Sequence, residues 1–318
     1  MAVRRGMKLP APPFAARLAW SLLLAGAVSC AGQAWAQVAA AGPTAVHAVD
    51  DAGHALTLAA PAGRIVSLAP HLTELLFAAG AGAAVVGVDA FSDYPAAARS
   101  LPRIGDSARL DLERIVALKP DLVVAWHGGN SAAQLQSLAR LGLPVYASES
   151  RRLSDISSTL LRLGRLAGTE TAATARAVRF DAAVAELRAQ QAGKREVRVF
   201  YQIWHRPLLT VNGQHLIDET LRLCGGRNVF EGLAPLTPQV GEEAVLRADP
   251  EAIVAARSAA GGADPLAAWR RLTHLRAARL SNLLTVDPDT LHRQSERTLL
   301  GAAELCAGLD IVRARTPR

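Results

Sequence analysis

The chain has 318 residues, of which 50% are hydrophobic and 20% are charged, a composition typical of a globular protein with room for two domains. Its formal net charge is +7, but the Lys and Arg residues form no cluster with interleaved aromatic residues, which argues against a nucleic-acid-binding protein. The apolar run at 75–88 contains three glycines and is interpreted as a helix end, a turn and a strand, which excludes it as a membrane span.

Residues 1–36 have the layout of a secretory signal peptide. Four basic residues precede an apolar run from Leu18 to Ala31, and Ala34-Trp35-Ala36 supplies the small residues of a cleavage site. We expect cleavage after Ala36, which removes four positive charges and no negative ones and so lowers the net charge from +7 to +3. A lipoprotein-type site at Cys30 is the less favoured alternative, because no Leu stands three residues before it.

Residues 37–61 are expected to be a flexible N-terminal segment that includes a hairpin. Beyond it, residues 62–150 alternate short apolar runs with helical patterns. Strands are expected at 64–68, 85–88, 122–126 and 145–147, and helices at 73–80, 111–118 and 132–141. Strands that alternate with helices predict a mostly parallel sheet, so this part is predicted to be an N-terminal α/β lobe.

Residues 151–193 are predicted to be a connecting helical region centred on a long helix, 170–191. This stretch contains no Gly and no Pro, and its apolar residues recur at spacings of four and three, which places them on one helix face: Ala173, Ala177, Phe180, Val184 and Leu187. At about 1.5 Å per residue the helix is about 33 Å long, enough to join two lobes. The alternative is an ordinary surface helix of a single domain.

Residues 194–318 repeat the alternation and are predicted to be a C-terminal α/β lobe. Strands are expected at 197–203, 252–256 and 283–286, and helices at 215–223, 242–247, 266–274 and 298–309. One helix–proline–acid–strand unit occurs in each lobe, as Glu113-Arg-Ile-Val-Ala-Leu-Lys-Pro120 and Glu243-Ala-Val-Leu-Arg-Ala-Asp-Pro250. The two halves therefore look related by duplication, and each exposes one carboxylate at a helix start. Acidic residues are favoured in first turns in any case, which is the simpler explanation.

The sequence contains none of the common catalytic motifs. There is no G-x-S-x-G elbow, no H-E-x-x-H, no Walker A loop and no G-x-G-x-x-G that opens a helix. None of the eight histidines is paired at i,i+2 or i,i+4, so no metal-ligand set is predicted. We therefore expect a protein that is not an enzyme, with an exported α/β hydrolase as the alternative from a different class.

Two cysteines, Cys224 and Cys306, remain after removal of the signal peptide. Cysteines of an exported chain are expected to pair, and the alternative is two buried thiols. A disulfide between them would close a loop with a sequence separation of 82 (306 − 224). In a chain-entropy model, such a bond contributes about 4 kcal/mol to the free energy of unfolding.

Large polar and aromatic side chains stand at the ends of predicted strands. Phe91 follows 85–88, Trp126 ends 122–126 and Trp204 follows 197–203, while Asp289 and Arg293 follow 283–286. Because ligands bind at the carboxyl ends of strands in open α/β sheets, we predict a broad, flat, apolar ligand between the lobes. Core packing of the aromatic residues, and an i,i+4 ion pair between Asp289 and Arg293, are the alternatives.

Residues 62–312 resemble the periplasmic cobalamin-binding proteins of vitamin ABC importers, within the helical-backbone substrate-binding proteins. The resemblance rests on Arg64–Glu74, Phe91–Pro95, Leu112–Trp126 with Gly128-Gly129-Asn130, Leu223–Phe230 and Pro238-Gln-Val240. It implies a class III-type α/β fold: two Rossmann-like lobes with mostly parallel sheets, joined by a single long helix. The superfamily also takes up haem, siderophores and metals, so a haem or siderophore receptor is the alternative.

By position, the resemblance implies a ligand site between the lobes formed by Phe91, Trp126, Trp204, Asp289 and Arg293. The implied ligand is cobalamin or a related corrinoid, with no catalytic cofactor and no metal site of the protein's own; His292 or His205 as an axial ligand of the corrinoid's cobalt is the less favoured alternative. Phe91 stands where the family has Tyr, and Ser107 and Thr237 fall where large aromatic residues would line the pocket, which leaves the particular corrinoid open.

The same resemblance implies the partner. Glu113 and Glu243 match the two acids with which the family docks on its transporter, so the expected partner is the two-fold permease of an ABC importer. We expect a periplasmic monomer.

Overall fold

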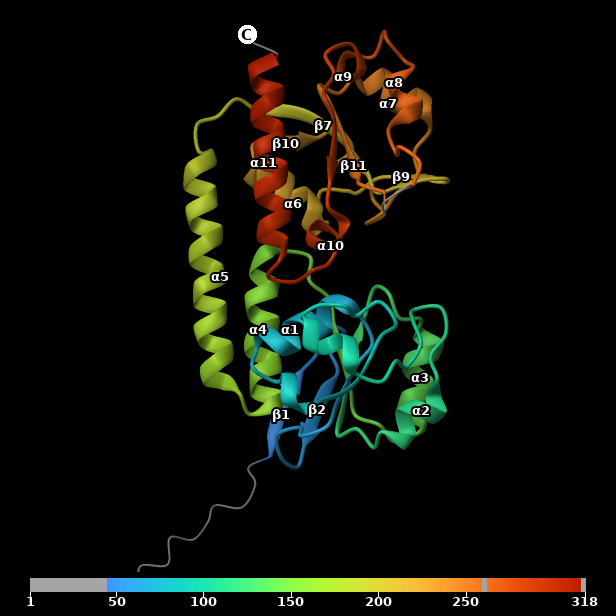
Figure 1. Ribbon diagram of the computed structural model, residues 1–318, viewed down its shortest axis with the longest axis vertical. Coiled ribbons are helices and arrows are strands. Elements are labelled where there is room, and N and C mark those ends of the chain that lie inside the picture. Colours follow the sequence, from blue (N-terminus) through green and yellow to red (C-terminus); the bar gives the residue numbers. More distant parts are fainter. Residues whose placement is uncertain (1–44, 259–261, 316–318) are drawn as a thin grey trace, which may run out of the picture. The chain divides into compact units, whose positions relative to one another are not determined.

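The computed structural model describes residues 45–258 and 262–315. The predicted signal peptide, the alternative site at Cys30 and residues 37–44 lie outside the described residues. Within them, two sheets of four parallel strands each form the centre of a lobe, in the orders β4-β3-β5-β6 and β10-β7-β11-β12. The prediction of an α/β fold with two parallel-sheet lobes is therefore confirmed (Figure 1).

The elements of the N-terminal lobe and the connection follow the chain. The lobe contains β1 (Val46–Val49), β2 (Ala55–Leu58), β3 (Ile65–Ser67), α1 (Pro70–Ala78), η1 (Gly82–Ala84), β4 (Val85–Val88), η2 (Ala96–Ser100), α2 (Leu112–Ala117), β5 (Leu122–Trp126), α3 (Ala132–Arg140) and β6 (Val145–Ser148). The connection consists of α4 (Leu153–Ala167) and α5 (Glu170–Gln191).

The C-terminal lobe follows α5. It contains β7 (Val197–Gln202), β8 (Trp204–His205), β9 (Leu208–Leu209), α6 (Leu216–Leu223), β10 (Gly226–Asn228), α7 (Glu242–Ala248), β11 (Ala252–Ala256), α8 (Ala267–Arg270), α9 (Arg276–Arg279), β12 (Leu283–Val286), α10 (Pro288–Leu291) and α11 (Thr298–Arg315). The edge strand β10 begins two residues after Cys224 and pairs with β7, although the sequence analysis predicted no strand there.

Both sheets are covered on both faces, as parallel sheets require. In the N-terminal lobe, one face packs against α1, α4 and α5, and the other against a cluster that includes Ile104, Ile115 and Leu138. In the C-terminal lobe, α6 and α11 cover one face, and the segment from α7 to α9 covers the other. The strands of each sheet therefore carry apolar residues on both sides.

The N-terminal hairpin β1–β2 is part of the first lobe. Val46 and Leu58 are buried in the main core cluster of that lobe. At the turn, the Asp51 N–H donates to the Ala147 carbonyl at 2.9 Å, and the Asp51 carboxylate forms a salt bridge with Arg162 of α4. The hairpin is thereby fixed to both the sheet edge and the connecting region.

Helix α5 lies beside α4 and runs past both lobes (Figure 1). The face predicted from its spacing is the buried one, with Ala173, Ala177, Phe180 and Val184 in the core. Close approach of the two helices depends on Gly164 of α4, since a Cβ atom there would lie 2.3 Å from the Ala173 Cβ. The connection is thus a packed helix pair, whose first member the sequence had placed only within a helical region.

The disulfide predicted from the sequence is confirmed. Cys224, directly after α6, is bonded to Cys306 of α11, with a Cα–Cα distance of 4.7 Å. The bond holds together the two helices that cover one face of the C-terminal sheet.

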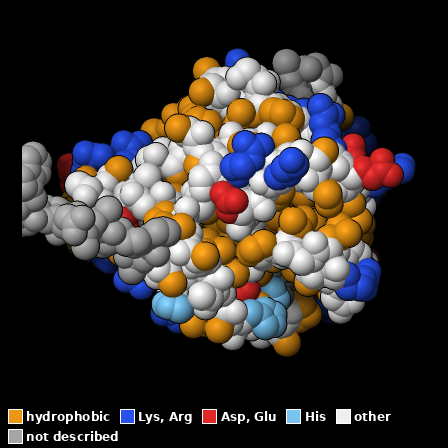
Figure 2. Space-filling model, turned by 90° about the horizontal axis from the view of Figure 1, so that it is seen from below, with side chains coloured by type: hydrophobic (Ala, Val, Ile, Leu, Met, Phe, Trp, Pro, Cys, Tyr) orange, Lys and Arg blue, Asp and Glu red, His pale blue; other side chains and the backbone are white. Residues whose placement is uncertain are grey.

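Charged side chains on the surface are mixed with apolar ones. On the described part of the face seen in Figure 2, Lys and Arg side chains are spread among hydrophobic and neutral side chains. Within residues 45–258 and 262–315, no helix combines the length and apolar character needed to cross a membrane.

Candidate functional site

The loop after β4 carries an exposed aromatic ring on a fixed base. Asp89 is 2% exposed, and its Oδ1 accepts a hydrogen bond from the Phe91 N–H at 2.8 Å. Burial raises the pKa of the Asp89 carboxyl to about 6, against the lowering effect of the Phe91 bond. Arg103 donates to the carbonyls of Asp89 and Ser92 at 3.2 and 2.7 Å. Phe91 itself is 63% exposed, so the loop presents this ring to solvent.

Trp126 ends β5 and lies against a glycine turn. A Cβ atom on Gly129 would lie 1.9 Å from Cε3 of the indole, so only glycine permits this ring position. The edge of the His71 ring meets Trp126 with 5.2 Å between ring centroids, and Asn130 Oδ1 accepts from the Trp126 N–H at 2.9 Å. The indole Nε1 is buried without a partner among the described residues. The ring is therefore held from several sides.

Trp204 belongs to the two-stranded hairpin β8–β9, directly after β7. Its side chain is 56% exposed, and its Nε1 donates to the Arg206 carbonyl at 2.9 Å. Its ring lies 5.6 Å from the His205 ring, centroid to centroid. The hairpin thus presents Trp204 to solvent beyond the edge of the packed core.

The lobes are joined at a buried carboxylate, Glu74 of α1, which is 3% exposed. Arg293 and Arg297 of the C-terminal lobe place their Nη1 atoms 3.1 and 3.0 Å from Glu74 Oε1. The Ser295 hydroxyl donates to the second oxygen, Oε2. A buried carboxylate needs such partners, because desolvation of an unpaired charge is costly.

Arg293 has two further carboxylate partners. Its Nη1 lies 2.6 Å from Asp93 of the β4 loop, and its Nη2 lies 2.9 Å from Asp289. Burial disfavours the charged guanidinium, but the bonds to Asp93 and Glu74 prevail and raise its pKa. The i,i+4 ion pair considered from the sequence is therefore present, and Arg293 also connects the lobes. Its side chain is 15% exposed, whereas that of Asp289 is 49% exposed.

The predicted site residues come together in part. Phe91, Trp126, Asp289 and Arg293 all lie in segments that follow strand ends at the interlobe contact, and Trp204 follows β7 of the second sheet. The sequence prediction left Glu74 and Tyr94 out of the site, although Tyr94 lies in the same loop as Phe91. Tyr94 is 46% exposed, and the Arg297 guanidinium lies 4.3 Å from its ring centroid. Glu74 left one signal: it is an acid between Leu72, Leu75 and Leu76 in an otherwise apolar helix.

A buried histidine, His71, and a half-buried one, His292, lie near the interlobe contact. Burial lowers the pKa of His71 to about 3, with a smaller contribution from the charge of Arg293. Burial also lowers the pKa of His292 to about 4, and its Nε2 lies 2.8 Å from the Tyr201 hydroxyl. Both imidazoles are therefore neutral at pH 7. The part of the chain that the structure describes contains no group of three His, Cys, Asp or Glu residues placed to hold a metal ion.

Glu113 and Glu243 are exposed residues in the first turns of α2 and α7. The repeated unit in which they occur has a shared backbone feature. Lys119 and Asp249, each directly before the proline, both have a positive φ, at 47° and 39°. In both units, the residue between the helix and the proline therefore has the same left-handed backbone conformation. This shared conformation supports an origin by duplication.

Comparisons with known proteins give a consistent result. Residues 65–290 match the periplasmic binding protein family. A vitamin B12-binding protein of Vibrio parahaemolyticus is 35% identical over 255 residues, which cover 80% of this chain and 92% of that protein. A vitamin B12-binding protein of Yersinia pestis is 37% identical over 252 residues, which cover 79% of this chain and 88% of that protein.

Solved structures show the same similarity. The periplasmic vitamin B12-binding protein BtuF of Vibrio cholerae has a TM-score of 0.73 at 34% identity, with 80% of this chain and 98% of that chain covered. The apo periplasmic heme-binding protein RhuT of Roseiflexus has a TM-score of 0.69 at 24% identity, with 78% of this chain and 98% of that chain covered. The second likeness shows the fold alone.

Proposed function

The chain belongs to the periplasmic binding protein family, and on that premise we propose that it captures cobalamin or a related corrinoid between its lobes and delivers it to an ABC importer. The observation that carries the proposal is the exposure of two aromatic rings, Phe91 and Trp204, on loops at the carboxyl ends of the two sheets. Such rings mark ligand sites when they lie beside a cleft between domains. Relatives about 35% identical that are named for vitamin B12 binding support the choice of ligand.

Each site residue has a distinct role in this proposal. Phe91 and Trp204 cover the faces of the flat macrocycle, and Trp126 supports it from a position fixed by Gly129. Asp289 offers its half-exposed carboxylate to the amide groups at the corrin periphery. Arg293 holds Asp289 in place and connects it to the other lobe.

Titration of the exported chain with cyanocobalamin tests the proposal directly. We expect heat release and a change in corrin absorbance at micromolar ligand or below. No heat and no spectral change at that concentration would refute it. The same experiment with haemin tests the alternative, a haem receptor. Haemin is chosen because several structural neighbours are named for heme binding. Tighter binding of haemin than of cyanocobalamin would select the alternative.

Delivery to a permease is the second part of the proposal. Glu113 and Glu243 dock on basic pockets of the two permease halves, one acid on each lobe. The double substitution Glu113→Arg/Glu243→Arg is expected to abolish uptake and to leave binding in solution unchanged, because paired rim charges set orientation and association rate. Asp181→Arg/Glu186→Arg, with the same charge change on exposed positions of α5, is the matched control. Equal loss of uptake in both double variants would contradict the docking assignment.

Export and the absence of a chemical step complete the proposal. The protein binds and releases its ligand unchanged, acts as a monomer and reaches the periplasm through cleavage after Ala36. The intact mass of the protein recovered from cells tests this. A lipid-modified chain that begins at Cys30 would show a membrane anchor instead.

A further inference from the structure

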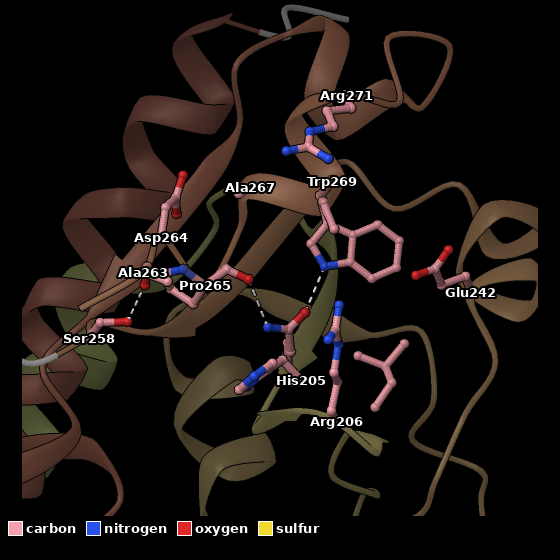
Figure 3. Close-up of a pocket in the computed structure, with 13 residues that line it drawn as sticks. His205, Arg206, Glu242, Ser258, Ala263, Asp264, Pro265, Ala267, Trp269 and Arg271 are labelled. Atoms are coloured by element: carbon pink, nitrogen blue, oxygen red, sulfur yellow. Dashed lines mark hydrogen bonds between the residues drawn. The ribbon is translucent and has the colours of Figure 1, made fainter.

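A cavity of about 430 Å³ lies in the C-terminal lobe, between the β8–β9 hairpin and the segment that carries α8. The indole of Trp269 is 3% exposed and forms part of its wall. The Trp269 Nε1 donates to Gln202 Oε1 at 2.6 Å, and the Gln202 amide donates to the Pro265 carbonyl at 3.0 Å (Figure 3). The wall is therefore held by hydrogen bonds that leave the cavity open.

Two arginines line this cavity. Arg206 comes from the turn of the hairpin and Arg271 directly follows α8, and they flank Trp269 in Figure 3. Neither guanidinium has a hydrogen bond or an ion pair with any residue in 45–258 or 262–315. The neighbouring Arg270 differs, because its Nε lies 3.0 Å from Asp264 Oδ2.

The charge of the cavity favours an anion with one negative charge. Its charged lining residues are Arg206, Arg271, Glu242 and Asp264. Arg270 forms an ion pair with Asp264 and neutralises its charge. Arg206 and Arg271 then face one carboxylate, that of Glu242, so the cavity has a net charge of +1. Guanidinium groups bind phosphate oxygens through paired hydrogen bonds, and a phosphodiester carries one negative charge at neutral pH.

The cavity is continuous with the hairpin that carries Trp204. The Arg206 carbonyl accepts from Trp204 Nε1, and His205, whose ring lies beside that of Trp204, also lines the cavity. A ligand whose macrocycle lies on Trp204 therefore has an anion-binding cavity next to the same hairpin. A volume of this order is at the lower end for small-molecule sites, roughly 300–1,000 Å³, and suits part of a ligand.

We infer that this cavity binds the phosphodiester of a corrinoid's nucleotide tail through Arg206 and Arg271, an inference that rests on the proposed function. A complete corrinoid such as cobalamin carries this tail. Cobinamide has the same macrocycle but lacks the phosphodiester. The two arginines thus make the receptor selective for complete corrinoids.

The test compares cyanocobalamin, dicyanocobinamide and inorganic phosphate as separate ligands in titrations of the full exported chain. For the unaltered chain we expect cyanocobalamin to bind about tenfold or more tightly than dicyanocobinamide, since a hydrogen bond to a charged group contributes a factor of about ten or more. Arg206→Gln/Arg271→Gln should reduce this preference to near one without changing the affinity for dicyanocobinamide. Arg279→Gln, at an exposed arginine of α9 that does not line the cavity, is the matched control and should keep the preference.

The outcomes separate this inference from the proposed function. If neither corrinoid binds the unaltered chain, both fail. If both corrinoids bind with equal affinity, or if the double variant keeps the preference, the proposed function stands and the inference is overturned. If phosphate binds the unaltered chain and not the double variant, while the corrinoid preference is the same in both, the cavity is a free-phosphate site and the assignment to the tail is wrong.

Discussion

The two lobes share a four-stranded parallel sheet covered by helices, yet they hold their aromatic side chains differently. In the N-terminal lobe, Trp126 lies against the Gly128-Gly129 turn and meets His71. In the C-terminal lobe, Trp204 projects from a hairpin of two-residue strands and is 56% exposed. The first lobe therefore offers a fixed surface and the second an adjustable one. A ligand gains more from a surface that needs no ordering on binding.

The lobes also differ in how they are stabilised. The C-terminal lobe has the Cys224–Cys306 bond, and the described part of the N-terminal lobe has no disulfide. Between the lobes, Glu74 supplies the buried acceptor for Arg293 and Arg297. Four sets of variants test these differences, beginning with the largest expected effect.

The largest effect should come from the disulfide. Replacing both cysteines in Cys224→Ala/Cys306→Ala should lower the free energy of unfolding by about 4 kcal/mol, because the bond closes a loop with a sequence separation of 82. Denaturant unfolding gives the value. Reductant should lower the midpoint of the unaltered chain by a similar amount and leave the double variant unchanged. A response of the double variant to reductant would show that another group is responsible.

The interlobe carboxylate should come next. Glu74→Gln removes the buried carboxylate that Arg293 and Arg297 share, which should cost about 3 kcal/mol of unfolding free energy. Asp289→Asn removes a half-exposed carboxylate from the same arginine and should cost less than about 1 kcal/mol. Chemical denaturation of both variants compares the two. Equal losses would mean that Glu74 is not the main connection between the lobes.

The comparison of the two tryptophans concerns ligand affinity. Trp126→Ala should weaken binding of cyanocobalamin by about 2 kcal/mol and Trp204→Ala by about 1 kcal/mol, since packed and well-supported side chains contribute most at an interface. Calorimetric titration measures both. Trp126→Phe keeps an aromatic ring and should recover part of the loss. A larger loss for Trp204 would reverse the assignment of fixed and adjustable surfaces.

The last prediction concerns pH and the C-terminal lobe. Burial lowers the pKa of His215 from 6.5 to about 4, and its Nδ1 accepts from the Ile217 N–H at the start of α6. Below pH 6.5, His215 of the unfolded chain binds a proton, whereas His215 of the folded chain stays neutral until the pH approaches 4. The free energy of unfolding therefore decreases as the pH falls from about 6.5 toward 4. The loss amounts to about 1 kcal/mol per pH unit for this group.

His215→Asn isolates that contribution, because Asn also caps helices and does not titrate. Thermal unfolding at pH 7.5 and pH 5 should show a smaller acid loss in the variant than in the unaltered chain. His71 and His292 have lowered pKa values too, so part of the loss should remain. If the variant and the unaltered chain lose the same stability between pH 7.5 and pH 5, the other two histidines are responsible for the loss.

The sequence by itself determined most of the longer elements and indicated the family. Spacings of three and four in 170–191 identify the buried face of α5, and two cysteines in an exported chain identify their disulfide. These features are local or concern few candidates, so a pattern suffices. The motifs at 64–74 and 112–130 were specific enough to indicate the family before any coordinates.

Only the tertiary structure decided how the side chains are paired. Glu74 and Arg293 are far apart in the sequence, and nothing local shows that they meet. The same holds for Arg206 and Arg271, which the fold brings to one cavity on either side of Trp269. From the sequence alone, a charged residue is expected to lie on the surface in contact with water, because its neighbours in space are not known. Burial and partnership depend on the whole chain, so the interlobe contact and the cavity could be found only in three dimensions.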